Sequence, residues 1–347
     1  MRQVPHDIKP NRFAIMKLLF VCLMPLHAMT SHAQSQAAYP SKPIKLILPL
    51  AVGSAVDLAA RIVTQKMSAN MGQSFVIENM PGAAGLIGAE KVAKAAPDGY
   101  TLGGFNDGII TMAPNLNSNM PYDSLKDFAY ISLVTTVEAG LVVPANSPYK
   151  NIGQLLKAAN QSPGKINYSS GGNGSPQHIG VAMIEAQTGV KMFHIPYKGA
   201  TQAVQDVAAG QVDFTLLGLA TAAGMVKAGK LNLIGVPMKL RHPQFPDVPT
   251  FAESGLPDFE FSTWFVLAAP SNTSPEILKQ LHKEIQLALS DKETIEKLQA
   301  LGLTPRGLSP IETSELTKVN YMRYGKIIKD AKIKACLLYT SPSPRDS

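Results

Sequence analysis

Apolar and amphipathic segments alternate along the chain from residue 39 onward. Residues 43–50 form an almost continuous apolar run, interrupted only by Lys45, which is typical of a strand buried on both faces. Ser54 then predicts an N-cap, and one apolar helix face follows as far as Gly72, which predicts the end of that helix. This strand–helix rhythm predicts an α/β fold whose parallel sheets carry helices on both faces.

The same rhythm continues through most of the chain. Further strands are expected at residues 74–78, 100–105, 141–143, 166–169, 192–197, 214–217 and 231–236. The last part of the chain, at 275–300 and 310–334, is expected to be helical and charged. Two alternating regions joined by a return through residues 256–270 predict a protein with two lobes.

One strand is joined to its helix by a glycine-rich turn, within residues 165–178. Glycines let the backbone approach a ligand closely, and the free N–H groups of a helix start favour an anion. Ser175 and Pro176 predict the N-cap and the first helical residue, and Ser169 and Ser170 add hydroxyl groups. The turn indicates a site for a small carboxylate or phosphate, with an ordinary strand–helix connection as the alternative.

The N-terminal segment has the pattern of an export signal. Lys17 precedes an apolar run at residues 18–26, and residues 31–33 form a small-x-Ala cleavage site. The apolar run is too short to remain as a membrane span. We therefore expect residues 1–33 to be a signal peptide, with Met16 as an alternative start, and the mature protein to lie in the periplasm.

Composition and charge exclude several classes of protein. A length of 347 residues suggests two domains, and 45% hydrophobic with 16% charged residues indicates a globular chain. The formal net charge is +7, of which the first 33 residues supply +3 through four basic residues and one acidic residue. Because Lys/Arg runs are missing elsewhere and aromatic residues make up 7% of the chain, we expect no nucleic-acid partner.

The cysteines leave no basis for a disulfide or a thiolate metal site. Cleavage of the signal would leave Cys336 as the one remaining cysteine. Residues 336–347 also break the helical pattern that precedes them, and we expect them to be a non-native tail.

Enzyme signatures are missing from the sequence. It contains no Gly-x-Ser-x-Gly elbow, no Walker-type loop and no His-Glu-x-x-His motif. Ser175 and His178 lie three residues apart, but no third group that would orient them as nucleophile and base is evident. We therefore expect no catalytic residue, metal or cofactor. A periplasmic enzyme or ligand sensor acting on a small organic anion is the second hypothesis.

Six motifs occur in order between about residue 39 and residue 335, and together they carry a family resemblance. They are Pro49–Asp57, Glu78–Gly82, Ala96–Thr101, Ser169–Gly174, His194–Gly199 and Asp247–Thr250. The series resembles the Bug family, the periplasmic substrate-binding receptors of tripartite tricarboxylate transporters. One such motif alone would be a weak signal, whereas six in order are specific.

The resemblance implies a type II periplasmic-binding-protein fold, with two lobes, a hinge and an interlobe cleft. The lobes would close on a small carboxylic acid or amino acid and deliver it to a membrane permease. The resemblance also implies a discontinuous first lobe at 39–140 plus 262–335, and a second lobe at 141–261. In this family backbone N–H groups, hydroxyls and water typically hold the carboxylate, without an arginine clamp. We expect a monomer.

The resemblance and the glycine-rich turn together select candidate ligand-binding residues from both expected lobes. The candidates are Gly53, Ser54, Asp57, Asn106, Asp107, Ser169, Ser170, Asn173, Gly174, Ser175, His178, Tyr197 and Lys198. Asp57 has a structural alternative as an acid in the first turn of its helix. His178 has one as a hydrogen-bond partner that fixes the loop, and Lys198 as a solvated side chain.

Two loops depart from the family pattern. Leu50, Val52 and Ser54 stand where an aromatic residue, a second proline and a second glycine are common. Asn106 and Asp107 follow the third strand, where a serine or threonine would be expected. If Asp107 faces the cleft, it should repel a second carboxylate and favour a ligand with an amino group or a neutral tail. A helix-capping or solvated Asp107 is the alternative.

Overall fold

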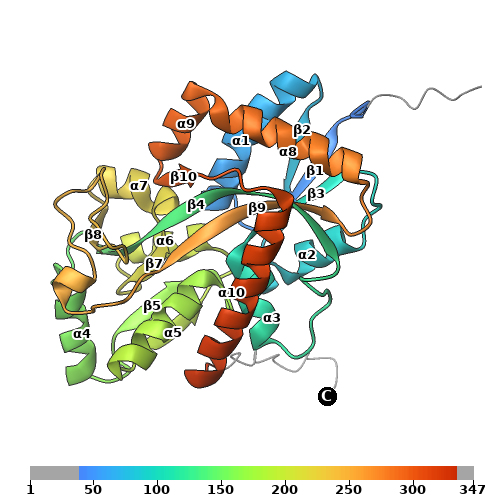
Figure 1. The fold of residues 1–347 in the computed structure, drawn as a ribbon. Helices are drawn as coiled ribbons and strands as arrows, with labels where there is room; N and C mark the ends of the chain where they lie inside the picture. The colour runs from blue at the N-terminus through green and yellow to red at the C-terminus, as the bar shows by residue number, and fades with distance from the viewer. Residues whose placement is uncertain (1–38, 334–347) are drawn as a thin grey trace, which may run out of the picture. The chain divides into compact units, whose positions relative to one another are not determined.

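The computed structural model of the protein describes residues 39–333, and Figure 1 shows the arrangement of its helices and strands. The expected signal peptide at 1–33 and the expected tail at 336–347, with Cys336, lie outside the described residues. Among the helices within 39–333, none is both long enough and apolar enough to cross a membrane.

The first part of the chain forms three parallel strands with helices between them. These elements are β1 (Ile44–Leu48), α1 (Ala55–Met71), β2 (Phe75–Asn79), α2 (Leu86–Ala93) and β3 (Thr101–Asn106). Strand β1 lies between β2 and β3 and runs parallel to both. Helix α1 begins after Ser54, whose side chain accepts a hydrogen bond from the Asp57 N–H, and ends at Gly72 in the left-handed conformation. The helix limits expected from the sequence are confirmed.

Two long strands run antiparallel to their neighbours, which corrects the expectation of purely parallel sheets. Strand β4 (Phe128–Pro144) pairs with β9 (Ser262–Pro270) and with β10 (Leu303–Pro305) along its first part. The end of β4 pairs with β7 (Thr215–Gly218) and β8 (Leu231–Gly235). We call the sheet of β1, β2, β3, β9 and β10 with its helices the first half, and the region of β5 (Asn167–Ser170) to β8 with its helices the second half, so β4 belongs to both.

The sequence predicted only residues 141–143 of this long strand. The earlier part of β4 was missed because its pattern is irregular: its register with β9 shifts between Tyr130 and Ser132 and again between Leu133 and Thr135. Ser132 and Thr135 are also completely buried polar residues, so they interrupt the apolar run that would indicate a buried strand.

The middle of the chain contains most of the remaining strands and their helices. The elements are α4 (Ile152–Gln161), β5 (Asn167–Ser170), α5 (Pro176–Thr188), β6 (Phe193–Pro196), α6 (Ala200–Ala208) and α7 (Leu219–Lys227). Strands β5 and β6 form a parallel pair, and Tyr168 of β5 forms a bridge with Phe214. The strands expected near these positions are confirmed to within a few residues.

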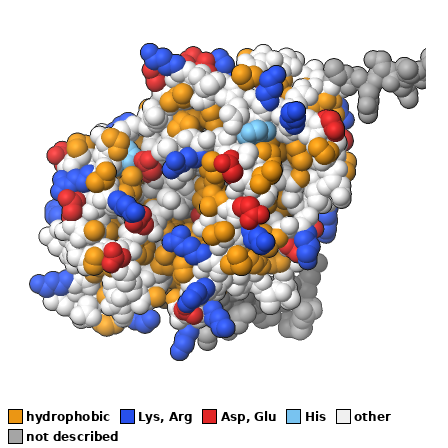
Figure 2. Space-filling model, in the orientation of Figure 1, with side chains coloured by type: hydrophobic (Ala, Val, Ile, Leu, Met, Phe, Trp, Pro, Cys, Tyr) orange, Lys and Arg blue, Asp and Glu red, His pale blue; other side chains and the backbone are white. Residues whose placement is uncertain are grey.

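Three helices end the described chain, where the sequence predicted two helical segments, at 275–300 and 310–334. They are α8 (Pro275–Ser290), α9 (Lys292–Gln299) and α10 (Pro310–Asp330). Helix α10 begins with a capping box between Ser309 and Glu312, and Figure 1 shows it lying across strands β4 and β9. Acidic and basic side chains lie close together on the face seen in Figure 2. Among the ion pairs of the described residues, Lys66 with Asp291 joins α1 to the start of α9.

Short helical segments occur at four further places. They are Ala83–Gly85, Gly108–Met112, α3 (Ala113–Leu116) and Ala252–Ser254. The segment Gly108–Met112 is a π-helix that directly follows Asn106 and Asp107, at the end of β3.

The apolar core divides between the two halves, and β4 contributes to both. Val134 and Val137 pack with the residues of β1, α1 and α8. Leu141 and Val143 pack with Tyr168, Phe214 and their neighbours in the other half. The two halves therefore have separate cores that share a strand.

Candidate functional site

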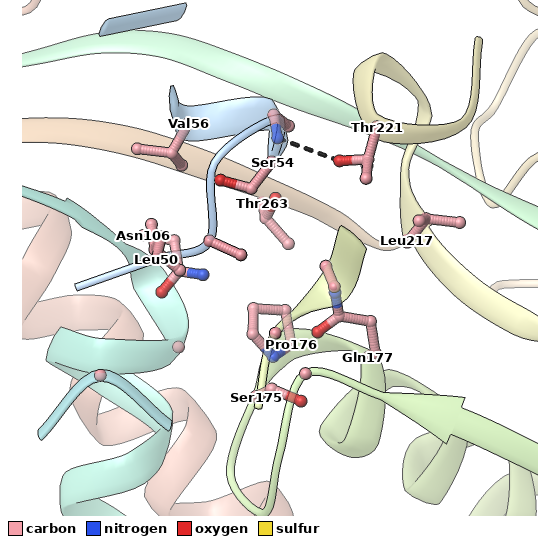
Figure 3. Close-up of a pocket in the computed structure, with 18 of the residues that line it drawn as sticks. Leu50, Ser54, Val56, Asn106, Ser175, Pro176, Gln177, Leu217, Thr221 and Thr263 are labelled. Carbon is pink, nitrogen blue, oxygen red and sulfur yellow. Dashed lines mark hydrogen bonds between the residues drawn. The ribbon is translucent and has the colours of Figure 1, made fainter. Parts of the chain in front are cut away.

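A narrow pocket lies where several helices begin, and Figure 3 shows its lining. The first half contributes the start of α1 at Ser54, together with Asn106 at the end of β3. The second half contributes the starts of three helices, at Ser175, Ala200 and Gly218. The cavity volume is about 60 Å³, which is room for about four to six water-sized groups.

Helix N-termini give this pocket a positive electrostatic potential. Helices α1, α5, α6 and α7 all begin at residues that line it. Each N-terminus presents the positive end of a helix dipole, which favours a bound anion. Some N–H groups of these first turns are already used, because Ala55 donates to Thr221, Asp57 donates to Ser54, and Pro176 has no N–H. Lys198 is the one charged side chain among the described residues of the lining, and it is exposed. The preference for an anion therefore comes mainly from the backbone.

The backbone N–H groups of the glycine-rich turn are largely used within the turn. The Gly172 N–H donates to Ser170 Oγ at 3.1 Å, and the Gly174 N–H donates to His178 Nδ1 at 3.1 Å. The Ser175 N–H donates to the Gly172 carbonyl at 3.1 Å. The turn is thus shaped by its own hydrogen bonds, and these three N–H groups do not point at the pocket as free donors.

Two histidines with stacked rings hold the glycine-rich turn in place through hydrogen bonds. The rings of His178 and His194 lie 4.3 Å apart between centroids and 6° from parallel, and Tyr168 stacks on the other face of His194. His194 Nε2 lies 2.6 Å from Ser170 Oγ. Burial lowers the pKa of His178 to about 4, and burial together with His178 lowers the pKa of His194 to about 3, so both rings are neutral at pH 7. His178 fixes the loop by a hydrogen bond, as expected.

The loop before α1 is organised around the buried carboxylate of Asp57. Asp57 accepts hydrogen bonds from the Gly53 N–H, from Arg61 and from Asn79. Burial opposes ionisation of Asp57, but these hydrogen bonds outweigh it and lower the pKa. Asp57 and Gly53 do not line the pocket. Asp57 is therefore an acid in the first turn of its helix that shapes the loop, which is the structural alternative given above.

Asp107 does not face the pocket. Its side chain is completely buried, and Oδ1 accepts a hydrogen bond from the Gly108 N–H at 3.1 Å. Burial raises the pKa of Asp107 to about 8, so its carboxyl is mostly protonated at pH 7. The argument that Asp107 repels a second carboxylate therefore does not apply, and the capping alternative describes the residue.

Four of the thirteen candidates line the pocket: Ser54, Asn106, Ser175 and Lys198. Ser169 is buried behind it and donates to the Ala203 carbonyl, and the Tyr197 hydroxyl donates to Asp206. The other candidates outside the lining are Gly53, Asp57, Asp107, Ser170, Asn173, Gly174 and His178.

Three polar side chains of the lining were missed by sequence reasoning: Gln177, Thr221 and Thr263. In a strand, alternate side chains point to opposite faces, and nothing in the sequence of β9 showed which face meets the pocket. Thr263 lines the pocket, whereas its neighbour Trp264 lines a separate groove of about 730 Å³.

Direct contacts join the two halves beside the pocket. Thr221 Oγ1 accepts a hydrogen bond from the Ala55 N–H at 3.0 Å, shown dashed in Figure 3. The Thr201 hydroxyl donates to the Val52 carbonyl at 2.9 Å. A Cβ atom on Gly199 would lie only 2.7 Å from the Cβ of Ala51. The structure is thus a closed arrangement in which both halves touch.

The described residues offer no cluster for a metal ion. Within 39–333, no group of three or more His, Cys, Asp or Glu side chains is placed to hold one. The site described here is therefore built from neutral polar groups, apolar walls and helix starts.

Comparison with known proteins identifies the family. Residues 59–333 match the tripartite tricarboxylate transporter family receptor. The UPF0065 protein from the tcbD–tcbE intergenic region of Pseudomonas sp. strain P51 is 37% identical, over 88% of this chain and 91% of its own length.

Solved structures agree with this match. The periplasmic binding protein BugD is 30% identical with a TM-score of 0.81, over 85% of this chain and 99% of its own. Rhodopseudomonas palustris Rpa4515 with adipate is 31% identical with a TM-score of 0.82, over 85% of this chain and 98% of its own. MatC from the same organism, with bound malate, is 29% identical with a TM-score of 0.80, over 84% of this chain and 100% of its own.

The two-lobed type II periplasmic-binding-protein fold is confirmed by these structures, and the relatives are receptors and not enzymes. The sequence match, the fold and the pocket between the two halves agree with one another. The chain belongs to the family of tripartite tricarboxylate transporter receptors, the Bug family of periplasmic solute-binding proteins.

Proposed function

We propose that this receptor captures one small carboxylate-bearing metabolite in the pocket between its lobes and delivers it to a membrane permease. The observation that carries the proposal is the convergence of four helix starts, one from the first half and three from the second, on a single pocket. Such an arrangement favours an anion without an arginine clamp. The proposal is supported by the malate and adipate that two structural neighbours bind.

The pocket suits the carbon body of such an acid as well as its charge. Leu50, Val56 and Leu217 form apolar walls, while Ser54, Asn106 and Ser175 supply polar groups. Ligand pockets commonly combine an apolar lining with a few polar groups that fix orientation. Lys198 lies exposed in the lining, where its charge helps to attract an anion.

Closure follows from the position of the donors on both halves. An anion that contacts the start of α1 and the starts of α5 and α6 bridges the two lobes, so its binding shifts the population toward the closed state. The hydrogen bonds of Thr221 to Ala55 and of Thr201 to Val52 then add contacts that exist only in this state. Occupancy of the pocket is thereby coupled to closure.

Several further features remain part of the proposal. The first lobe comprises residues 39–140 plus 262–335 and the second 141–261, although Tyr324 and Ile328 of α10 pack in the core of the second half. Residues 1–33 direct export, the mature chain acts as a monomer, and its partner is the permease of a tripartite transporter.

Titration calorimetry on the protein without residues 1–33 tests the proposal. Malate, succinate and adipate are each compared with the corresponding diamide, which keeps the shape and removes the charge. We expect at least one diacid to bind one to one and its diamide not to bind measurably. Equal binding of acids and diamides, or no binding of any acid, would count against the proposal.

The variant Gly199→Ala provides a second test of the proposed function. The added methyl group would meet Ala51 across the pocket, so the lobes should not close and affinity should fall. Gly224→Ala is the matched control, because a Cβ there has no atom within 4 Å. Unchanged affinity in Gly199→Ala would show that the ligand binds elsewhere.

A further inference from the structure

Two polar side chains of the pocket lack a partner within the protein. Gln177 is 9% exposed and Thr263 is 8% exposed. Both line the pocket, and Figure 3 shows them on opposite sides of the space between the starts of α1 and α5. Within residues 39–333, neither the Gln177 amide nor the Thr263 hydroxyl has a hydrogen-bond partner. Their polar atoms open onto the pocket and are not among the solvent-inaccessible polar atoms that lack a partner. A ligand that fills the pocket excludes water from these two groups, so it must offer them hydrogen bonds in its place.

Other polar groups of the lining already have partners. Ser54 Oγ accepts from the Asp57 N–H, and Asn106 Oδ1 accepts from the Ile109 N–H. Thr221 Oγ1 accepts from the Ala55 N–H. These acceptor atoms hold the helix starts in place, while the Ser54 and Thr221 hydroxyls and the Asn106 amide N–H groups can still donate to a guest. Gln177 and Thr263 differ in that none of their side-chain polar atoms is used within the described part of the protein.

The chemistry of the two groups limits what the guest carries. The amide of Gln177 offers two N–H donors and one carbonyl acceptor, and the hydroxyl of Thr263 both donates and accepts. A ligand hydroxyl or primary amide also donates and accepts, so it satisfies both side chains. A carboxylate oxygen only accepts, so it pairs with the Gln177 N–H groups or the Thr263 hydroxyl but leaves the Gln177 carbonyl unpaired, and an unsubstituted carbon chain pairs with neither side chain. An ammonium group only donates, and its positive charge is disfavoured among helix N-termini.

We infer that Gln177 and Thr263 select a carboxylate whose short carbon body carries a neutral hydroxyl or amide group. The inference rests on the proposed function, because it assumes that the carboxylate is held by the same pocket. Gln177 and Thr263 recognise the hydroxyl or amide substituent, and the helix N-termini recognise the charge of the carboxylate. The small cavity favours a compact acid over a bulky one.

Calorimetry with two matched pairs of acids tests this inference: lactate beside propionate, and malate beside succinate. Each pair differs by one hydroxyl group. We expect the hydroxylated acid of at least one pair to bind about 10- to 100-fold more tightly to the natural protein. Gln177→Leu and Thr263→Val should each reduce that preference several-fold, whereas Thr263→Ser should retain it. Thermal unfolding checks that each variant is folded.

The outcomes separate the two proposals. If the acids bind but the hydroxylated members bind no more tightly, the inference is wrong and the proposed function stands. If the preference survives both Gln177→Leu and Thr263→Val, these residues do not select the ligand. If none of the four acids binds but adipate does, the inference is wrong and the proposed function stands. If adipate does not bind either, the proposed function fails, and the inference fails with it.

Discussion

His178 and His194 stack face to face, with ring centroids 4.3 Å apart and planes 6° from parallel. Through this pair, both ends of the glycine-rich turn are fixed to one rigid unit. His194 bonds Ser170 at the beginning of the turn, and His178 accepts from Gly174 near its end. The turn therefore keeps its shape before any ligand arrives, which lowers the ordering cost of binding.

Replacing His194 by phenylalanine should keep the stack but remove one hydrogen-bond partner of Ser170, whose Oγ still bonds the Gly172 N–H and carbonyl. Because Ser170 keeps these two bonds, we expect the free energy of unfolding to fall by about 1 kcal/mol. Ligand affinity should also fall, because the turn would no longer be held in place. Urea unfolding and calorimetry measure the two effects. His282→Phe, on α8 and outside the lining, should leave affinity unchanged, and an unaltered affinity in His194→Phe would refute the positioning role.

The same pair predicts a loss of stability in mild acid. An unfolded histidine takes up a proton near pH 6.5, whereas the pKa of the folded His178 is about 4 and that of His194 about 3. Between those values the unfolded chain binds more protons, so stability is full above about pH 6.5 and declines as the pH falls.

Urea unfolding between pH 7 and pH 5 measures this contribution by comparison with a variant that lacks both histidines. Asp107 contributes in the opposite direction over this range, but its contribution is the same in both proteins. We expect the double variant His178→Phe with His194→Phe to show a clearly shallower decline than the natural protein. Equal slopes would mean that neither histidine resists protonation in the folded state.

For Asp107, we predict that the free energy of unfolding depends on pH in the direction opposite to that of the two histidines. Burial raises its folded pKa to about 8, and an unfolded aspartate titrates near 3.9. The folded state therefore keeps a proton that the unfolded state loses, and stability falls as the pH rises from about 4 to about 8. Asp107→Asn should abolish this loss, which we expect to be on the order of a few kcal/mol. The measurement is the difference in unfolding free energy between variant and natural protein at pH 5 and pH 8; a constant difference would contradict it.

A substitution of Thr221 should weaken closure of the lobes and have little effect on the stability of the fold. Thr221→Val removes the acceptor for the Ala55 N–H that joins the two halves. Since this bond forms only when the lobes meet, we expect ligand affinity to weaken by about fivefold to tenfold, corresponding to about 1 kcal/mol. Thr221→Ser keeps the acceptor and should bind normally. A large loss of unfolding free energy without a loss of affinity would show that the contact serves folding instead.

Local signals in the sequence predicted the elements well. Ser54 and Gly72 mark the ends of α1, and Ser175 marks the start of α5, because capping depends on single residues. The direction and length of the strands were harder to predict from the sequence. The antiparallel course of β4 depends on partners far away in sequence, and its bulges disrupt the alternation that would have revealed it.

The candidate pocket includes the starts of α1 and α5, where the sequence placed candidate residues, but only four of the thirteen candidates line it. The sequence located the glycine-rich turn and the start of α1, since both follow from glycines and caps. It did not show that Ser170 and His178 occupy the N–H groups of the turn, because those bonds depend on how separate segments meet. Nor did it reveal Gln177 and Thr263, whose role depends on the face they occupy.

The most direct test of the central claim is native mass spectrometry of the receptor purified without residues 1–33 from cells grown in rich medium, followed by titration of whatever ligand it retains. We predict one small carboxylic acid per chain in the natural protein and in Gly224→Ala, and its loss in Gly199→Ala. A neutral or cationic ligand, or a ligand that Gly199→Ala retains equally well, would contradict the account.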